Sequence, residues 1–406
     1  HGELGYKEFN TAEKFIKKMK ELGLRTETGL AITGTKAYLN EEKKDTASLA
    51  LLGELDALRI PEHAHANPET DAAHCCGHHA QMAGIFGATL ALTVPEIAEK
   101  LGGQVVFFAT PAEEYGEIEF KNQLREQGKI RYGGGKCELI RTGAFDDIDL
   151  CLAHHIQPGD EIQVGSGTGN GFVSKVIRYL GKAAHAAGAP DKGVNALSAA
   201  SLGLQALGLN RETFRDEDCV RVHPIITKGG NLVNVIPDEI VIETLVRAKT
   251  IEAFTDAAKK TDRSFQAGAV AMGAKVEITT LPGYLPTLAE QALPELKRAA
   301  ELAAPEVPVR EAAGHSGGST DVGDVQHLMP VYTFNTGGVK GGLHQINSEE
   351  EAYIDTAKMF ALAAYGLLKE KAARSKELVK NYKPVFKDSA EYTKFMEQFD
   401  SKEVLD

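Results

Sequence analysis

The sequence has no tryptophan, only five cysteines among 406 residues, and no apolar run as long as a membrane span. A bilayer-crossing helix needs about 20 consecutive apolar residues, so none is predicted. Basic residues are also in deficit, with 45 Lys and Arg against 57 Asp and Glu, and the net charge is −12. Such a field repels phosphate backbones and anionic lipid headgroups. Nucleic acid and membrane partners are therefore not expected.

The small, odd number of cysteines excludes a disulfide scaffold and is typical of a reducing compartment. The first residues show no basic segment followed by an apolar stretch, so no secretory leader is predicted, and the expected location is the cytoplasm. The remaining composition, 43% hydrophobic and 25% charged, is that of an ordinary globular protein. The length predicts two or three domains.

Short apolar runs alternate with a helical pattern in the first part of the chain. Runs at 48–52, 105–109 and 148–153, with a helical stretch at about 80–92, predict an α/β fold with a mixed, largely parallel sheet. The Gly-rich segment 165–171 then marks a boundary. Beyond it the pattern changes, and after Pro282-Gly283 the helix–strand–helix rhythm of the first domain resumes.

The inserted segment has its own order of predicted elements. These are strands at 172–180, 220–227, 240–246 and 276–281 and helices at 194–207 and 251–272. The order β-α-β-β-α-β is that of a ferredoxin-like domain. We therefore predict one domain from residues 1–169 and 283–406, interrupted by a second at 170–282.

Residue types that can bind metals gather directly before the predicted helix at 80–92. Five of the thirteen histidines lie between positions 63 and 79, and Cys76 and His78 flank Gly77. A thiolate and an imidazole at this spacing can reach one cation together, although two small buried thiols and solvated histidines would fit the same segment. Asp56 follows the first apolar run, where it either orients a ligating histidine or caps the next turn.

Acidic and imidazole side chains also follow the other runs. Glu113 and Glu114 come after the second run, His154 and His155 end the third, and His344 lies in a Gly-rich loop. One carboxylate of such a pair can hold a cation while the other moves a proton, or the pair begins an acidic helix. Because parallel strands present their carboxyl ends at one edge of a sheet, we expect these groups to converge.

Eight motifs carry a family resemblance along nearly the whole chain. In order they are GELDAL, HCCGHH, PAEE, LAHHIQPG, GKAAHAAGAP, NLVNVIPD with a following VR, STDVGD and GLH. Together they resemble the aminoacylase and carboxypeptidase G superfamily of dinuclear metallopeptidases. They are most similar to its amidohydrolase branch, which includes indole-acetyl-amino-acid, hippurate and aminobenzoyl-glutamate hydrolases. The resemblance implies a metal domain interrupted by a dimerising lid domain.

The resemblance also implies roles for individual residues. It makes Glu113 the general base, places Asp56 beside the site, and gives one or two divalent ions, Zn or Mn, the ligands Cys76, His78, Glu114, His155 and His344. In the lid it implies that His185 polarises the scissile carbonyl across a homodimer or larger homo-oligomer, and that Asn234 and Arg247 hold the substrate. From the residues alone, Arg247 is equally compatible with a strand-edge charge that faces water.

Three positions depart from the family pattern. His79 and Gln81 replace an Asp and a His, and Glu54 stands where other branches carry a metal-binding His. The expected function is metal-dependent hydrolysis of the amide bond of an N-acyl amino acid, an aminobenzoyl-glutamate-like conjugate or a dipeptide.

Two alternatives remain at this level. One is a serine hydrolase that uses Ser316, which lies in a G-x-S-x-G pattern with Asp321, Asp324 and His344 downstream. The other is a metal-free scaffold protein of the same fold. The intact pair Glu113-Glu114 and Cys76 argue against both, since neither alternative explains them.

Overall fold

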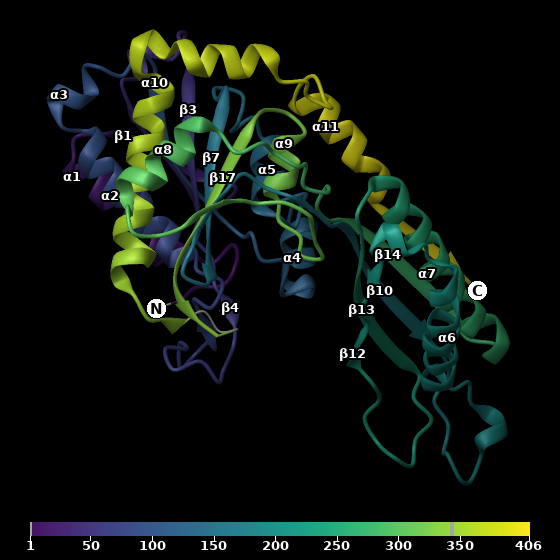
Figure 1. Cartoon of the computed structure of the whole chain (residues 1–406). Coiled ribbons are helices and arrows are strands. Elements are labelled where there is room, and N and C mark those ends of the chain that lie inside the picture. Colours follow the sequence, from purple (N-terminus) through teal and green to yellow (C-terminus); the bar gives the residue numbers. More distant parts are fainter. Residues whose placement is uncertain (1, 342–344) are drawn as a thin grey trace. The chain divides into compact units, whose positions relative to one another are not determined.

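The chain folds into two compact units in a computed structural model that describes residues 2–341 and 345–406 (Figure 1). Unit 1 comprises 1–168, 287–315 and 320–393, and unit 2 comprises 169–286, 316–319 and 394–406. Among the described residues, no helix combines the length and the apolar character needed to cross a membrane. The assignment of 170–282 to a dimerising lid stays a prediction.

Unit 1 is built on a nine-stranded mixed sheet, which confirms the predicted mixed α/β class. Along the sheet the strand order is β1-β2-β6-β3-β7-β17-β8-β15, and β18 pairs with β17. The bounds are β1 Arg25–Leu30, β2 Gly34–Leu39, β3 Ser48–Glu54, β6 Gln104–Thr110, β7 Leu150–Pro158, β8 Ile162–Val164, β15 Val309–Glu311, β17 Val331–Lys340 and β18 Gln345–Ile346.

The central strands β6, β3, β7 and β17 are parallel neighbours, whereas β1 and β2 add antiparallel strands at one side. All seven residues of β3 and all seven of β6 are buried. Strands covered on both faces read as continuous apolar runs, which is why the sequence located them. Short strands β4 (Leu58–Arg59) and β5 (Ala72–Ala73) form a separate ribbon after β3.

Helices α2 (His78–Leu92), α8 (Pro294–Ala303) and α10 (Thr356–Asn381) pack together beside this sheet (Figure 1). The approach of α2 to α10 is close, since a Cβ on Gly84 would lie 2.3 Å from the Thr356 methyl carbon. The remaining helices of unit 1 are α1 Phe9–Glu21, α3 Pro95–Ala98, α4 Ile118–Glu126, α5 Gly135–Arg141 and α9 Val322–Gln326, and α11 (Ser389–Met396) ends in unit 2.

Unit 2 is an antiparallel sheet with two long helices. Its strand order is β11-β13-β10-β14-β19, with β12 also paired to β13. The strands are β10 Gly171–Leu180, β11 Arg221–Val222, β12 Ile225–Lys228, β13 Glu239–Ala248, β14 Lys275–Pro282 and β19 Ser401–Leu405, and the helices are α6 Ala196–Asn210 and α7 Ile251–Met272. The assignment of this unit to the ferredoxin-like class stays a prediction.

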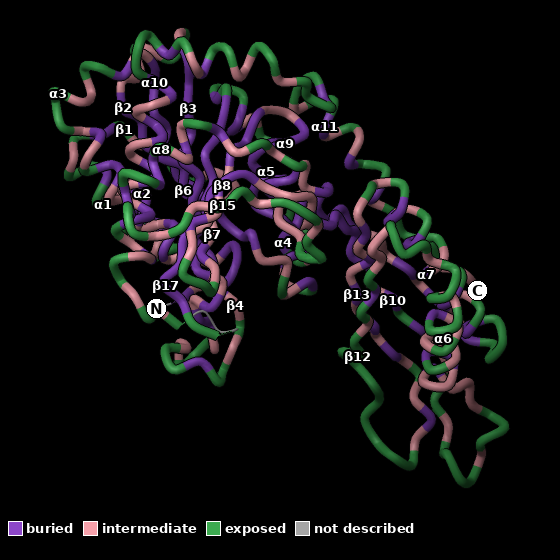
Figure 2. The backbone as a smooth tube through the Cα atoms, viewed as in Figure 1, coloured by how far each residue is buried: buried purple, intermediate pink, exposed green. Residues whose placement is uncertain are grey.

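Burial alternates along β13 of unit 2, in contrast to the wholly buried strands β3 and β6 of unit 1 (Figure 2). Along β13 buried and half-buried residues alternate strictly, because one face of the sheet packs against α6 and α7. All four residues of β12 are exposed. The sequence did not anticipate β19, a short segment with Lys402 and Glu403 at its centre that forms a strand by pairing with β14.

Phe360 of α10 tests the packing of the helix layer on the sheet of unit 1. Its side chain is fully buried, and its ring lies 4.9 Å from that of Phe334, centroid to centroid. Truncating a buried Phe leaves a cavity, so we expect Phe360→Ala to destabilise unit 1 by roughly 3–5 kcal/mol. Calorimetric melting measures the change. Leu302→Ala, at a half-exposed position, is the control and should shift the melting temperature little; equal shifts would contradict the packing described here.

Candidate functional site

The parallel strands of unit 1 bring three of the predicted groups to one edge of the sheet. Leu52 of β3 is paired with Phe108 of β6 and with Ala153 of β7, so the three strands are in register near their carboxyl ends. Beyond these pairs follow Asp56, the pair Glu113-Glu114, and His154-His155, respectively. The carboxyl edge of such a sheet is where α/β folds place functional groups.

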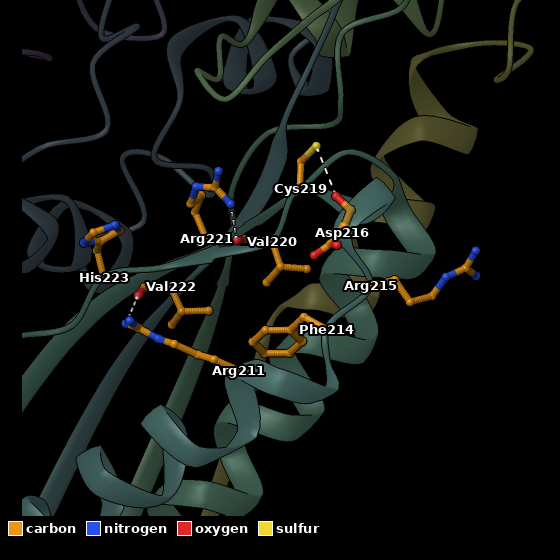
Figure 3. Close-up of a pocket in the computed structure, with 9 residues that line it drawn as sticks. All are labelled: Arg211, Phe214, Arg215, Asp216, Cys219, Val220, Arg221, Val222 and His223. Carbon is orange, nitrogen blue, oxygen red and sulfur yellow. Dashed lines mark hydrogen bonds between the residues drawn. The ribbon is translucent and has the colours of Figure 1, made fainter.

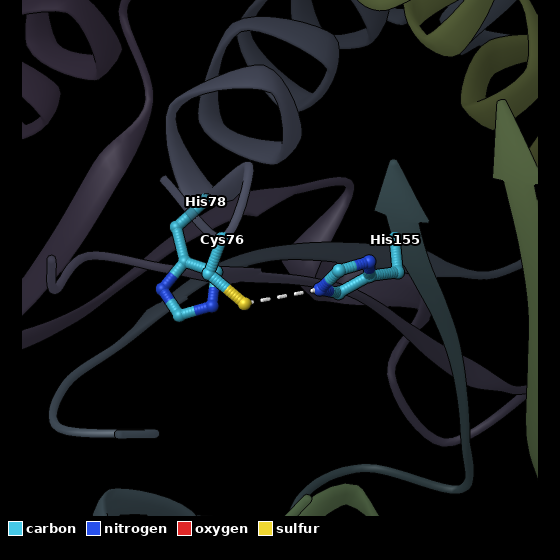
Figure 4. A group of neighbouring side chains, drawn as sticks. All are labelled: Cys76, His78 and His155. Carbon is cyan, nitrogen blue, oxygen red and sulfur yellow. Dashed lines mark hydrogen bonds between the residues drawn. The ribbon is translucent and has the colours of Figure 1, made fainter. Parts of the chain in front are cut away.

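Cys76, His78 and His155 form one compact group at this edge (Figure 4). Cys76 and His78 lie at the beginning of α2, where Gly77 adopts a left-handed φ of 89° that turns the chain. The Cys76 sulfur is 3.4 Å from His155 Nε2, and one ligand atom from each of the three residues lies within 4.8 Å of the others. Thiolate and imidazole at this spacing suit a borderline cation such as Zn²⁺.

The geometry separates the two adjacent histidines of β7. His155 Nδ1 contacts the carbonyl oxygen of Ile156 at 2.7 Å, so Nδ1 carries the proton and Nε2 presents its lone pair toward Cys76. His154 instead lies in the core, where its Nε2 contacts the Thr336 hydroxyl at 2.8 Å and its ring packs on Phe334. Burial accordingly lowers the pKa of His154 well below its usual value. Only His155 joins the group.

His78 also belongs to a second group, with Glu54 and Glu113. Its Nδ1 faces the Asp56 carbonyl oxygen at 2.9 Å and the Asp56 Oδ1 at 3.2 Å, so Asp56 orients the ring. Its Nε2 lies 3.0 Å from Glu54 Oε2 and 3.9 Å from Glu113 Oε2. His78 thus stands between the two groups, and Asp56 contacts it rather than capping a local turn.

The segment that carries Glu113 and Glu114 is held through its backbone on several sides. Glu8 accepts the Ala112 N–H at 2.8 Å, and Asp56 Oδ2 accepts the Glu114 N–H at 2.9 Å. Lys121 donates to the Glu114 carbonyl at 2.6 Å. The segment is therefore a fixed loop rather than the start of a helix, since α4 begins only at Ile118. The sequence did not single out Glu8 or Lys121. Glu8 lies far from Glu113 in the chain, and Lys121 lies in a charged segment that resembles a surface helix.

Lys136 was also missed, although it is fully buried beside the site. Its Nζ donates to Glu54 Oε1 and to Asp321 Oδ1, both at 2.6 Å, and Gln81 donates to Glu54 Oε2 at 2.8 Å. Burial by itself would raise the pKa of Glu54, but Lys136 and His78 lower it to about 2. A buried ammonium needs such partners, and the only sequence signal was its position in the glycine-rich stretch 133–136.

Negative groups outnumber positive ones in this buried region, which fits a cation site. The buried carboxyl groups that contact His78, Lys136 or the backbone of the Glu113-Glu114 segment are Glu8, Glu54, Asp56, Glu113 and Asp321, against the buried ammonium groups of Lys121 and Lys136. In the described part of the chain, Glu114 Oε1 is buried without a hydrogen-bond partner. Thiolate, imidazole and carboxylate donors around this surplus suit one or two divalent cations.

The same burial shapes the acid–base properties of the site. It raises the pKa of Cys76 to about 12, and burial together with Glu54 and Glu114 raises the pKa of Glu113 well above its usual value. These shifts apply to the protein without a cation. A bound divalent ion acts in the opposite direction, because its charge favours the thiolate and the carboxylate.

The predicted lid residues lie in unit 2 and do not all come together there. His185 forms a β-bridge with Val235, and the Ala186 N–H donates to the Asn234 carbonyl at 2.9 Å, so His185 and Asn234 are neighbours. Arg247 is near the end of β13, beside Phe172 and within 3.3 Å of the Ser319 hydroxyl. Arg247 lies eight residues along β13 from Glu239, a span of roughly 26 Å, whereas Asn234 precedes the start of that strand.

Each unit has a cavity next to some of the predicted site residues. In unit 1 a cavity of about 770 Å³ is lined by residues including His63, His65, His74, His79 and Tyr353. In unit 2 a cavity of about 370 Å³ is lined by Arg211, Arg221 and His223, among others, and the two guanidiniums donate to backbone carbonyls (Figure 3). Arg221 is the strand partner of Arg247. The predicted ligand His344 lies outside the described residues.

Gly135 provides a test of how the loop is positioned. A Cβ at this residue would lie 1.7 Å from the Pro111 carbonyl oxygen, and its N–H donates to the Ala112 carbonyl. We expect Gly135→Ala to displace the loop, and with it Glu113 and Glu114, so that affinity for added Zn²⁺ falls at least about tenfold. Calorimetric titration measures the affinity. The control is Gly116→Ala, where a Cβ meets open space; unchanged affinity in folded Gly135→Ala would contradict this account.

Comparison with known proteins matches residues 50–366 to the family described as peptidase family M20/M25/M40. The human Xaa-Arg dipeptidase is 29% identical over 265 residues, which cover 63% of this chain and 55% of that protein. The N-acetyl-L-cysteine deacetylase of Bacillus subtilis is 32% identical over 257 residues, covering 60% of this chain and 56% of the relative. The chain thus spans about half the length of the curated relatives that it matches.

A solved structure shows the same fold along most of the chain. The crystal structure of a dinuclear metal-binding M20 peptidase from Bacillus subtilis is 22% identical, with a TM-score of 0.60, and the match covers 91% of this chain and 94% of that one. The family match confirms the resemblance to dinuclear metallopeptidases and amidohydrolases that the eight motifs predicted. Because the family match extends over 317 residues and includes the Cys76, Glu113 and His155 segments, the chain belongs to peptidase family M20/M25/M40.

Proposed function

We propose that this chain is a metal-dependent amidohydrolase or peptidase that cleaves the amide bond of an N-acyl amino acid, an aminobenzoyl-glutamate-like conjugate or a dipeptide. The observation that carries this proposal is the convergence of Cys76, His78 and His155 beside the carboxyl groups of Glu113 and Glu114. Structural residues rarely gather soft and hard metal donors with a spare carboxylate at one buried edge.

The proposed ligands are Cys76, His78, Glu114, His155 and His344. One or two divalent cations, Zn or Mn, would supply a polarised carbonyl and a water of lowered pKa. Asp56 keeps the His78 ring in the tautomer that presents Nε2 to the site. The buried, unpartnered Glu114 Oε1 provides a carboxylate oxygen for the same purpose.

Glu113 is the proposed general base and acid. Its backbone lies between Ala112 and Glu114, whose N–H groups are fixed by Glu8 and Asp56, so its carboxylate has a defined position. It takes a proton from the attacking water and delivers it to the departing nitrogen.

His185 is proposed to stabilise the oxyanion that forms on the scissile carbonyl. The Ala187 and Gly188 N–H groups donate to its Nδ1, the latter at 2.9 Å. Nδ1 is therefore the acceptor, and the neutral ring carries its proton on Nε2, where it can donate to an oxyanion. Two backbone donors thus set the tautomer that this role needs.

A homodimer is part of the proposal, because His185 and Arg247 are at opposite ends of β13 within one copy of unit 2. One substrate could contact both only if two copies contribute. The exposed edge strand β12 supports self-association, since Ile225 and Ile226 are 61% and 44% exposed. In this arrangement Asn234 and Arg247 would hold the substrate, with the guanidinium recognising a carboxylate.

The substrate class is supported by what the relatives are named for. One acts on Xaa-Arg dipeptides and another on N-acetyl-L-cysteine. All such substrates carry a linear amide beside a carboxylate, which is the chemistry that Arg247 would recognise.

The serine hydrolase alternative loses support in the structure. Asp321 is committed to Lys136 and Asp324 to the Tyr392 hydroxyl, so neither acid is available to orient a histidine for Ser316. Ser316 is the second residue of a two-residue strand, His315–Ser316, and α9 begins only at Val322, unlike the strand–turn–helix of a nucleophile elbow.

Glu113→Gln tests the catalytic proposal directly. The variant keeps the size of the side chain and removes the base, so we expect turnover to fall about 100- to 10,000-fold while the bound metal stays at the wild-type level. Hydrolysis is measured on a panel of N-acyl amino acids, aminobenzoyl-glutamate and dipeptides, and metal content by elemental analysis. A wild-type chain without affinity for divalent ions would favour the scaffold alternative, and full turnover in Glu113→Gln would refute the role of Glu113.

Mixed dimers test whether His185 acts across subunits. His185→Ala and Glu113→Gln homodimers should each be nearly inactive, because each lacks one required group. After unfolding and refolding as a mixture, hybrid dimers should contain one intact site, so about a quarter of the wild-type activity is expected if half of the dimers are hybrids. Mixtures of each variant with itself are the control. Absence of any recovery in verified hybrids would place His185 in the site of its own chain.

A further inference from the structure

Glu54 and Lys136 form a buried pair whose position relative to His78 has a consequence for metal binding. The Glu54 carboxylate has two oxygens with different partners. Oε1 accepts from the Lys136 ammonium at 2.6 Å, whereas Oε2 accepts from Gln81 at 2.8 Å and faces His78 Nε2 at 3.0 Å. The carboxylate is thus held from one side and presents its remaining electron pairs to the site.

The contact with His78 places two lone pairs at a distance that a positive charge can bridge. His78 Nδ1 faces the backbone carbonyl of Asp56 at 2.9 Å and therefore carries a proton. Its Nε2 lies 3.0 Å from Glu54 Oε2, a separation that either a proton on Nε2 or a cation bound to both atoms can bridge. Two ligands at about 2.0–2.2 Å from one cation are separated by roughly 3.0–3.5 Å, depending on the angle between them.

Lys136 keeps this arrangement in place. Its side chain is completely buried, and its ammonium bridges Glu54 Oε1 and Asp321 Oδ1 at equal distances. Asp321 Oδ2 also accepts the Lys136 backbone N–H at 2.8 Å, which fixes the first turn of α5. The single positive charge of Lys136 is shared by the two carboxylates of Glu54 and Asp321 and balances one of their two negative charges. Glu54 can therefore remain ionised while buried.

From this geometry we propose that Glu54 is an additional ligand of the cation bound by His78 Nε2, and that Lys136 is the positioning residue that directs the Glu54 carboxylate to it. The inference rests on the proposed function, since it concerns the same centre. It adds an oxygen ligand on the His78 side of that centre, away from the Cys76–His155 contact. Glu54, His78 and Glu113 each place one ligand atom within 4.8 Å of the others.

Titration with Co²⁺ tests the proposal without any measurement of activity. Calorimetry gives the number and affinity of the bound ions, and the near-ultraviolet charge-transfer absorption of a Co²⁺–thiolate bond reports on Cys76 separately. Glu54→Gln keeps the side-chain volume and leaves Lys136 paired with Asp321. We expect at least one binding step to weaken about tenfold or more, while the thiolate absorption is retained.

Lys136→Met should weaken the same step about 10- to 100-fold, because the carboxylate loses its support. The matched control is Lys36→Met. Lys36 lies on β2, and its buried ammonium group is paired with Asp147 at 2.5 Å. Its removal should leave Co²⁺ binding unchanged. If Lys136→Met does not fold, Glu54→Gln/Lys136→Met removes the opposite charges together. In that variant the weakened step should persist although folding is restored, as judged by circular dichroism.

The possible failures are distinguishable. A wild-type chain that binds no Co²⁺ would contradict the proposed function as a whole. A wild-type chain that binds Co²⁺, with equal affinity in folded Glu54→Gln and in the double variant, would overturn only the role of Glu54. Loss of stability without loss of Co²⁺ affinity in Lys136→Met would show that the pair is merely structural.

Discussion

The surplus of buried negative charge at the carboxyl edge of the parallel sheet is the constraint on which the site depends. Ionised carboxyl groups are costly to bury unless a positive charge lies close to them. Here Glu54, Asp56 and Glu113 converge on one imidazole, and Lys136 balances only part of their charge. Without a cation, protonation supplies the balance, because the pKa values of His78 and Glu113 are raised well above their usual values; a bound divalent cation would supply it instead.

The scaffold around this edge fixes groups through their backbone as much as through their side chains. The Glu113-Glu114 segment is held by Glu8, Asp56 and Lys121, which come from three other parts of unit 1. Proton transfer and metal binding both depend on geometry held within a fraction of an ångström. The strong burial of these supporting residues is therefore part of the chemistry, since it keeps water from competing for the same hydrogen bonds.

The proposed substrate-binding groups of unit 2 are arranged differently, since they lie near the two ends of an antiparallel sheet. The two ends of β13 separate Arg247 from the neighbourhood of His185. If His185 and Arg247 have the proposed roles, a sheet with one of them near each end suits the service of two sites in a symmetric pair of subunits. The proposed role of His185 as oxyanion donor and the proposed dimer thus both follow from the length of β13.

Much of the architecture was predictable because its signals are local in the sequence. The buried strands β3 and β6 are continuous apolar runs, and the helices of unit 2 follow clear periodic patterns. The order of the motifs identified the family, and the rule for parallel strands predicted that Asp56, Glu113 and His155 would meet. By contrast, β19 has no clear local signal, since this short segment of mixed polar and apolar residues forms a strand through pairing with β14.

The sequence by itself therefore determined the fold class, the family and the types of side chain available for catalysis. Only the tertiary structure distinguished His155, which faces Cys76, from His154, which packs in the core beside Thr336. It also revealed that Lys136 pairs with Glu54, 82 residues away along the chain, and with Asp321, 185 residues away. Such pairings depend on which residues the sheet brings together, and no spacing within a single segment records them.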